Sequence, residues 1–245
     1  MAVIDDPSAP GGKKSRRGLA IIGMVALLGA LGFSALGIWQ VERLVWKNGL
    51  IAAVEARSTA APTDPVADGT WENFDPDRDE YRQVSVSGVF DPTAEALVQA
   101  VTAYGGGFWV MTPLHLADGR SILVNRGFVP PENRNPDSRN PLPAGQVTVT
   151  GLLRQTEPDG GFLRSNDPAG DRWFSRDVAA IASAEGVANP APFFVDQQAS
   201  GTGYPMGGLT VLSFSNNHLV YALTWFALAL MLLGGFGYML WDRRR

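Results

Sequence analysis

The sequence predicts a membrane protein with two transmembrane α-helices and, between them, an α+β domain built mainly on an antiparallel sheet. Residues 18–39 and 219–241 carry no charged side chain, and each stretch exceeds the roughly 20 residues with which an α-helix spans a bilayer. The segment between them contains several short runs of alternating apolar and polar residues, separated by glycine and proline, as expected for strands and turns.

The charges beside the two apolar stretches predict their orientation. "KKSRR" stands before the first stretch, and "DRRR" ends the chain. Because positive residues next to a span stay on the cytoplasmic side, both termini are expected in the cytoplasm and the domain outside it. The expected parts are a cytoplasmic tail (1–17), a span (18–39), an extracytoplasmic domain (40–217), a second span (218–241) and a cytoplasmic tail (242–245).

The first span is expected to remain as an anchor. Its apolar run is longer than the roughly 7–15 residues of a signal-peptide core, and no small-residue cleavage site follows it. "VERLVWKNGLIAAVEARS" favours helix instead, so the helix is expected to continue to about Arg57. The opening "MAVIDDPSAPGG" is expected to be disordered and is unlike a mitochondrial transit peptide. A bacterial inner membrane, with the domain in the periplasm, is therefore favoured.

Alternating and apolar runs place the elements of the domain. The expected strands are residues 82–90, 107–114, 120–129 and 146–155, with weaker candidates at 193–197 and 209–214. Asp118-Gly119 predicts a hairpin between the second and third of these strands. Helices are expected at "TAEALVQAV" (93–101) and at residues 177–186, with Asp177 near the start and Gly186 as the C-cap. The glycines of "YGGGFW" indicate a turn or bulge.

The residue inventory argues against several functions. Two histidines and no cysteine make a structural zinc site very improbable, and six scattered methionines do not form a copper carrier's ligand cluster. No nucleophile elbow, metalloprotease motif or phosphate-binding loop is present, so no enzyme activity is expected. The net charge of −4 gives no basis for a nucleic-acid surface. The expected partners are membrane lipid and other proteins.

His218 stands at the outer end of the second span, directly after Asn216 and Asn217. Two interpretations stay open from the residues alone. In the first, the asparagine side chains cap the helix and the imidazole is an interfacial residue. In the second, the imidazole is a ligand for a metal or cofactor. Which interpretation applies depends on the residues of the segment that faces His218.

The facing segment is "LGIWQVERLVWK", at the outer end of the first span. In an antiparallel helix pair it brings Trp39 and Arg43, with Gln40 and Lys47, level with His218. Tyr221 and Trp225 extend the aromatic face one and two turns below the histidine. An imidazole, a cation and an apolar wall would suit haem, with His218 as axial ligand and Arg43 pairing with a propionate. Ala26, Ala30 and Ser34 form a small-xxx-small repeat that predicts close packing of the two helices.

Three motifs carry a resemblance to a known family. "LGIWQVERLVWK", "LVNRGFVP" and "NNHLVYALTWFALA" resemble the surfeit locus protein family, and the similarity runs from the first helix onward. The resemblance implies an assembly factor for haem–copper cytochrome c oxidase that handles haem a for insertion into subunit I. Its implied partners are that subunit and other oxidase assembly factors.

The resemblance also implies roles for single residues. His218 corresponds to the family's haem-linked histidine, and Trp39, Arg43 and Tyr221 correspond to its other motif residues. Arg126 of "VNRG" is expected to brace the external domain. Two alternatives stay open beside this interpretation: a cofactor-free membrane scaffold that stabilises oxidase assembly intermediates, and an enzyme that modifies haem or lipid.

Overall fold

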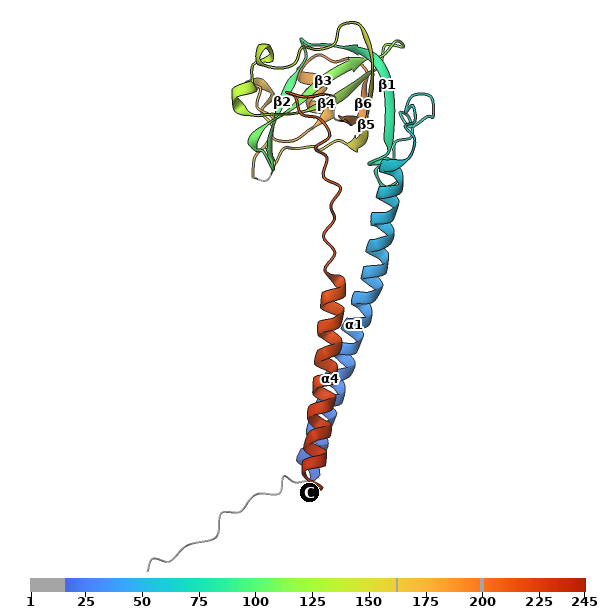
Figure 1. Ribbon diagram of the computed structural model, residues 1–245, viewed down its shortest axis with the longest axis vertical. Coiled ribbons are helices and arrows are strands. Elements are labelled where there is room, and N and C mark those ends of the chain that lie inside the picture. The colour runs from blue at the N-terminus through green and yellow to red at the C-terminus, as the bar shows by residue number, and fades with distance from the viewer. Residues whose placement is uncertain (1–15, 162, 199–200) are drawn as a thin grey trace, which may run out of the picture. The chain divides into compact units, whose positions relative to one another are not determined.

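A computed structural model describes residues 16–161, 163–198 and 201–245 (Figure 1). They form two compact units, one from the described residues up to Ile51 together with Phe214–Arg245, the other from Ala52–Ser213. The disorder expected for "MAVIDDPSAPGG", and most of the cytoplasmic tail expected at residues 1–17, lie outside the described residues.

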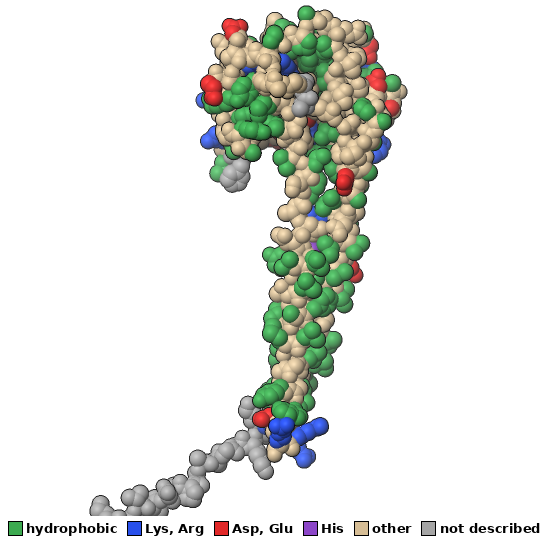
Figure 2. Space-filling model, in the orientation of Figure 1, with side chains coloured by type: hydrophobic (Ala, Val, Ile, Leu, Met, Phe, Trp, Pro, Cys, Tyr) green, Lys and Arg blue, Asp and Glu red, His purple; other side chains and the backbone are tan. Residues whose placement is uncertain are grey.

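The first unit is built on two helices, α1 (Arg16–Thr59) and α4 (His218–Asp242). Both are long and apolar enough to cross a membrane, and their large apolar side chains are mostly exposed, Val25 by 64% and Leu230 by 70%. Figure 2 shows hydrophobic side chains along the pair, with Lys and Arg gathered at the end where the chain terminates. Apolar surface on this scale indicates association with a membrane.

The seam between α1 and α4 is lined with small residues. Ala26 and Ala30 are buried, as are Ala222 and Ala229 on α4, and Ser34 is half-buried. Small side chains let two helix backbones approach closely in a medium where the hydrophobic effect cannot hold them together. The close packing predicted from the alanine repeat is therefore confirmed.

Glycines in α1 admit aromatic rings from α4. A Cβ added at Gly37 would lie 2.6 Å from the ring of Phe226, a distance that would force the ring to move. Four residues earlier, Phe33 stacks on Trp225 with ring centroids 5.5 Å apart. Gly32, by contrast, faces open space. The glycines on the seam thus decide how the aromatic side chains interlock.

The second unit is a β-barrel with a sixth strand attached. Its sheet has the order β1-β5-β6-β4-β3-β2, and an additional β1–β3 pairing closes the first five strands into a ring. The pairing is mainly antiparallel, as predicted, but β4 and β6 are parallel, and the closure was not predicted. The strands are β1 (Gln83–Phe90), β2 (Ala96–Thr102), β3 (Gly105–His115), β4 (Ser121–Val129), β5 (Gln146–Gln155) and β6 (Pro190–Gln197).

The ring closes because one edge of β3 serves two strands. Its first seven residues pair with β2, and its last two pair with β1, through Val89 opposite His115 and Phe90 opposite Leu114. The other edge of β3 forms the predicted hairpin with β4, whose turn is closed by the Leu116 N–H donating to the Arg120 carbonyl. An 11-residue strand is long enough for both partners.

Two hydrophobic clusters lie on opposite faces of the central strands. The first takes residues from all five strands of the ring and fills its interior, and the second packs β2, β3, β4 and β6 against Trp173 and α3 (Val178–Ala184). Val124 and Leu123 are neighbours on β4 and belong to different clusters, as alternation along a strand requires. Because both faces are covered, eight of the nine residues of β4 are buried.

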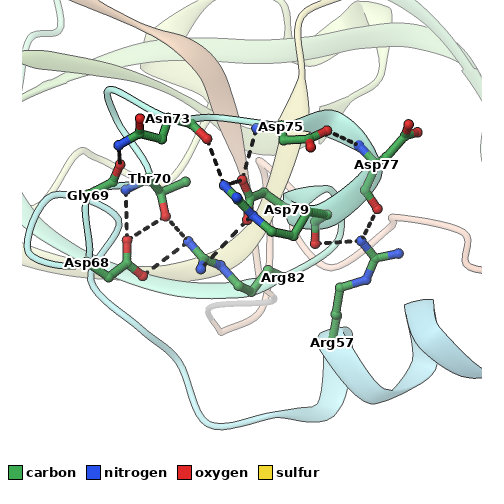
Figure 3. Close-up of polar contacts among 10 residues, drawn as sticks. Arg57, Asp68, Gly69, Thr70, Asn73, Asp75, Asp77, Asp79 and Arg82 are labelled. Carbon is green, nitrogen blue, oxygen red and sulfur yellow. Dashed lines mark hydrogen bonds and ion pairs between the residues drawn. The ribbon is translucent and has the colours of Figure 1, made fainter.

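Short helices complete the second unit. Helix α3 is capped as predicted: the Asp177 carboxylate accepts from the Ala180 N–H, and Gly186 follows the helix at φ +68°. Three 3-10 turns, η1 (Pro131–Asn133), η2 (Pro136–Ser138) and η3 (Pro168–Gly170), lie in the loops. Helix α2 (Pro76–Asp79) is tied to the end of α1 by Arg57, which donates to the carbonyls of Asp77 and Arg78 (Figure 3).

Two local predictions are wrong, and a third is confirmed only in part. Residues 93–101, expected to be a helix, lie mainly in β2, because pairing with β3 and the alternate burial of Ala96, Val98 and Ala100 override the helix propensity of alanine and leucine. The turn or bulge expected at "YGGGFW" is confirmed only at its start: Tyr104 lies in the turn between β2 and β3, whereas Gly105, Gly106 and Gly107 begin β3. Residues 209–214, expected as a weak strand, have no strand partner among the described residues.

Candidate functional site

His218, the first residue of α4, is joined to α1 by a hydrogen bond. Its Nδ1 lies 2.7 Å from Oε1 of Gln40, and the Gln40 side chain is buried in the seam while the imidazole is half-buried. The sequence predicted Gln40 level with His218, and in the structure this hydrogen bond joins the two residues. The buried glutamine thereby orients the imidazole.

This hydrogen bond selects one tautomer of the imidazole. The Gln40 oxygen has no proton to give, so Nδ1 carries the hydrogen and donates it. The lone pair of the neutral ring is then on Nε2, which has no hydrogen-bond partner among the described residues. A neutral imidazole held through one nitrogen presents the other as a metal ligand.

Asn216 and Asn217 act differently from the predicted helix cap. Asn217 occupies the N-cap position, but its side chain forms no capping hydrogen bond. Asn216 Nδ2 donates instead to Oδ1 of Asn48 on α1 at 2.8 Å, and its own Oδ1 is buried with no partner among the described residues. Asn216 and Asn48 therefore form a second polar link between the helices, and the side-chain oxygen of Asn216 is left as an unused acceptor.

The other predicted site residues form no hydrogen bond with the His218 side chain within the described part of the chain. Arg43 is one turn along α1 from Gln40, and its guanidinium carbon lies 3.7 Å from the centroid of the Trp46 ring. Trp39 and Tyr221 are exposed by 53% and 55%. Trp225 is half-buried in its stack on Phe33. These side chains, together with His218 and Gln40, are called the helix-pair mouth. The mouth presents an imidazole, a cation and two exposed aromatic side chains.

The second histidine is already engaged. His115 closes the barrel at the end of β3, where its Nδ1 lies 2.9 Å from Ser121 Oγ and its Nε2 lies 3.3 Å from Asp91 Oδ2. Hydrogen bonds from its imidazole and from Thr93 lower the pKa of Asp91, those from Thr93 most strongly. With both nitrogens engaged, His115 is a structural residue of the barrel.

The barrel holds a buried charged group that sequence analysis missed. Asp196 on β6 accepts hydrogen bonds from Arg154 at 2.9 Å, Arg176 at 3.2 Å and Asn125 at 2.8 Å. The two arginines, Asp196 and Trp109 line a cavity of about 180 Å³. The available signal was a charged residue inside an apolar strand, as in "FFVDQ" and "GLLRQ". This group links β4, β5 and β6 on the face of the second hydrophobic cluster, outside the interior of the ring.

Comparison with known proteins gives the family. The family model described as "SURF1 family" matches residues 27–230. This chain belongs to the SURF1 family. Surfeit locus protein 1 of Homo sapiens is 37% identical over 215 residues, which cover 79% of this chain and 69% of the human protein. The predicted resemblance is confirmed.

Two further relatives support the assignment. Surfeit locus protein 1 of Rattus norvegicus is 36% identical over 213 residues, covering 79% of this chain and 67% of the rat protein. The SURF1-like protein of Monosiga brevicollis is 35% identical over 221 residues, covering 81% of this chain and 79% of its own length. The SURF1 match extends from α1 through the barrel into α4, and so includes the helix-pair mouth.

Proposed function

We propose that this SURF1-family protein is a membrane-anchored assembly factor for haem–copper cytochrome c oxidase that holds haem a for insertion into subunit I. The observation that carries the proposal is the hydrogen bond between His218 and Gln40, which leaves Nε2 of the imidazole as a free ligand. The role is one of binding and release, without catalysis.

The residues at the helix-pair mouth fit haem. Haem supplies an iron with open axial positions, a wide apolar face and two carboxylates. Nε2 of His218 is the atom that would ligate the iron. Arg43 offers a guanidinium fork for a carboxylate. Trp39 and Tyr221 offer exposed aromatic surface for the apolar face.

The same residues favour temporary holding. His218 is half-buried, and Trp39 and Tyr221 are exposed, so the mouth is an open surface of the helix pair. His115, the only other histidine in the sequence, belongs to the second unit and has both nitrogens engaged, so it is not proposed as a ligand. One axial bond from an open surface allows the cofactor to pass to a client.

The proposed location is a bacterial inner membrane, with both termini in the cytoplasm and the barrel in the periplasm. Arg16 and Arg17 at the start of α1, and the three arginines that end the chain, support this orientation by the positive-inside rule. Asp242 at the end of α4 lies directly before those arginines. The proposed partners are oxidase subunit I and other assembly factors, which act at the same membrane.

A cofactor-free scaffold is the second candidate. It is favoured by the fact that the Gln40–His218 bond also links α1 to α4, because polar side chains commonly join helices in membranes. In that case the histidine serves helix packing alone. Loss of the imidazole would therefore remove haem binding if the first candidate is right, and only a contact between the two helices if the second is right.

The experiment compares absorption spectra of detergent-purified protein from cells that make haem a, for the parent and His218→Ala. The proposal predicts a reduced haem a band in the parent that is weakened in the variant, while the circular dichroism of the barrel is unchanged. Equal pigment in both would reject His218 as the ligand. Absence of pigment from both, with oxidase still failing to mature in a deletion strain, would establish the scaffold.

A further inference from the structure

A second charged group lies where β4 meets the loop that follows it. Glu95 Oε1 accepts from Arg139 Nη1 at 2.5 Å, while its Oε2 lies 3.6 Å from Arg126 Nη1. These residues line a pocket of about 450 Å³, whose other walls come from proline-rich segments. The further lining residues are Pro92, Pro136, Asp137, Asn140, Pro141 and Leu142.

Arg126 lies at a β-bulge of β4. The register of β3 and β4 shifts between Trp109 and Met111, so that Arg126 and Gly127 both lie opposite Val110. Gly127 has φ +129°, a conformation that favours glycine. Arg126 keeps the alternation of β4 and lies on the face of Val124, with its guanidinium carbon 5.7 Å from the centroid of the Phe90 ring.

The hydrogen bonds of the pocket are unevenly distributed. Arg139 is fully engaged, since it donates to the carbonyls of Asn133 and Arg134 as well as to Glu95. The side chain of Arg126 is only 10% exposed, yet it donates no hydrogen bond within the described part of the chain. None of the Arg126 nitrogens is both sealed from solvent and unpaired, so its N–H donors are open to a ligand that enters the pocket.

The four charged side chains that line the pocket sum to zero, and the three less exposed ones sum to one positive charge. Arg126 and Arg139 contribute two positive charges and Glu95 one negative charge. Burial lowers the pKa of the Arg126 guanidinium, Glu95 offsets part of the effect, and the positive charge of Arg139 lowers that pKa further. Asp137 is exposed and also lines the pocket. A single negative charge would balance the buried groups.

We propose that this pocket binds a carboxylate, held by the guanidinium fork of Arg126. Two parallel N–H donors match the two oxygens of a carboxylate and supply the missing hydrogen bonds. A phosphate dianion fits less well, because its second charge would be opposed by Glu95 and Asp137. The carboxylate comes from a free small acid or from an acidic side chain of another polypeptide. This inference is independent of the haem proposal.

The test uses the full chain in detergent and compares its thermal unfolding in sodium acetate and in sodium chloride of equal ionic strength. Acetate is expected to raise the midpoint of the parent, because a ligand of the folded state stabilises it by mass action. Arg126→Gln is expected to abolish the rise. Arg172→Gln, which changes an arginine that is 68% exposed outside the pocket, is expected to keep it.

A second variant protects the test if Arg126→Gln fails to fold. Asp137→Asn removes the exposed carboxylate from the pocket and is expected to strengthen acetate binding about two- to fivefold, the scale of exposed charge interactions. Acetate acting no better than chloride on the parent, or equally on Arg126→Gln, would overturn the proposal, as would an unchanged acetate affinity in Asp137→Asn.

A peptide arm identifies the source of the carboxylate. The probe is a short peptide amide with one glutamate, and its control is the same peptide with glutamine. Tighter binding of the glutamate peptide than of acetate assigns the pocket to an acidic side chain of a protein. Equal or weaker binding assigns it to a free acid.

Discussion

Nδ1 of His218 lies 2.7 Å from Oε1 of Gln40, and this hydrogen bond joins residues 178 positions apart in the sequence. It performs two tasks, since it links the helices and fixes which imidazole nitrogen carries the proton. The two tasks can be separated, because a leucine at position 40 removes both whereas a glutamate keeps an acceptor for the same proton.

Gln40→Leu is expected to weaken haem binding by about 10- to 100-fold, the usual effect of losing a partner that orients a metal-ligating histidine. Gln40→Glu is expected to bind haem nearly as the parent does. The measurement is a haem titration of detergent-purified protein, followed by absorbance. An unchanged dissociation constant for Gln40→Leu would show that the hydrogen bond serves helix packing alone.

Gly37→Ala is expected to destabilise the helix pair by about 1–3 kcal/mol, as overpacking commonly does, because its Cβ would lie 2.6 Å from the Phe226 ring. Gly32→Ala is the matched control in the same helix. Its Cβ would meet open space, so it is expected to be neutral or to stabilise by up to about 1 kcal/mol. Denaturant unfolding in mild detergent measures both variants, and equal effects would show that Gly37 is not a packing position.

Asp196→Asn is expected to destabilise the barrel by about 3 kcal/mol, because it leaves two buried arginines short of a negative partner. The remaining carboxylates of Glu80 and Glu157 limit the loss. Asp167→Asn breaks an exposed pair with Arg172 and is expected to cost less than about 1 kcal/mol. Chemical unfolding followed by tryptophan fluorescence compares them, and similar losses would contradict the assigned role of Asp196.

The stability of the barrel is expected to fall in acid, partly through Asp79. Burial alone would raise the pKa of this carboxyl, but hydrogen bonds from Arg78 and from the Asp75 N–H, with the charges of Arg78 and Arg82, lower the pKa below its ordinary 3.8. Because the folded state prefers the ionised form, this stabilisation is present above pH 3.8 and is lost as pH falls through the lower folded pKa.

The Asp79 contribution is measured by comparing unfolding free energies of the parent and Asp79→Asn as pH is lowered from neutral. The difference between the two proteins is expected to shrink toward the acid end. Asp77→Asn removes an exposed carboxylate from the same helix and is the control for the loss of one negative charge. A constant difference between the parent and Asp79→Asn would show that Asp79 contributes without titrating.

Much of the fold follows from local pattern. Strands β1, β4 and β5, the α3 cap at Asp177 and the two long helices were predicted because alternation, capping and apolar length are properties of neighbouring residues. β2 was mistaken for a helix because its pairing with the glycine-rich start of β3 outweighs local propensity. Ring closure through Val89 and His115 depends on contacts that no short window contains.

The candidate site was also predictable only in part. Antiparallel geometry brought Gln40 level with His218, and the structure joins them. The cap expected from Asn216 is absent because its side chain reaches Asn48 on the other helix, a partner far away in the sequence. Arg126 was assigned a bracing role, and nothing in "VNRG" revealed the bulge at Arg126 and Gly127 or the pocket that Arg126 lines.

The place of β6 in the ring has a consequence for incomplete chains. β6 is the last strand in the sequence, and it lies between β4 and β5. A chain that stops before Pro190 therefore leaves both neighbours with a row of unpaired N–H and C=O groups, which are templates for pairing with another molecule. Premature termination is thus expected to yield an aggregating product, and during synthesis the nascent barrel stays open until its final strand emerges from the ribosome.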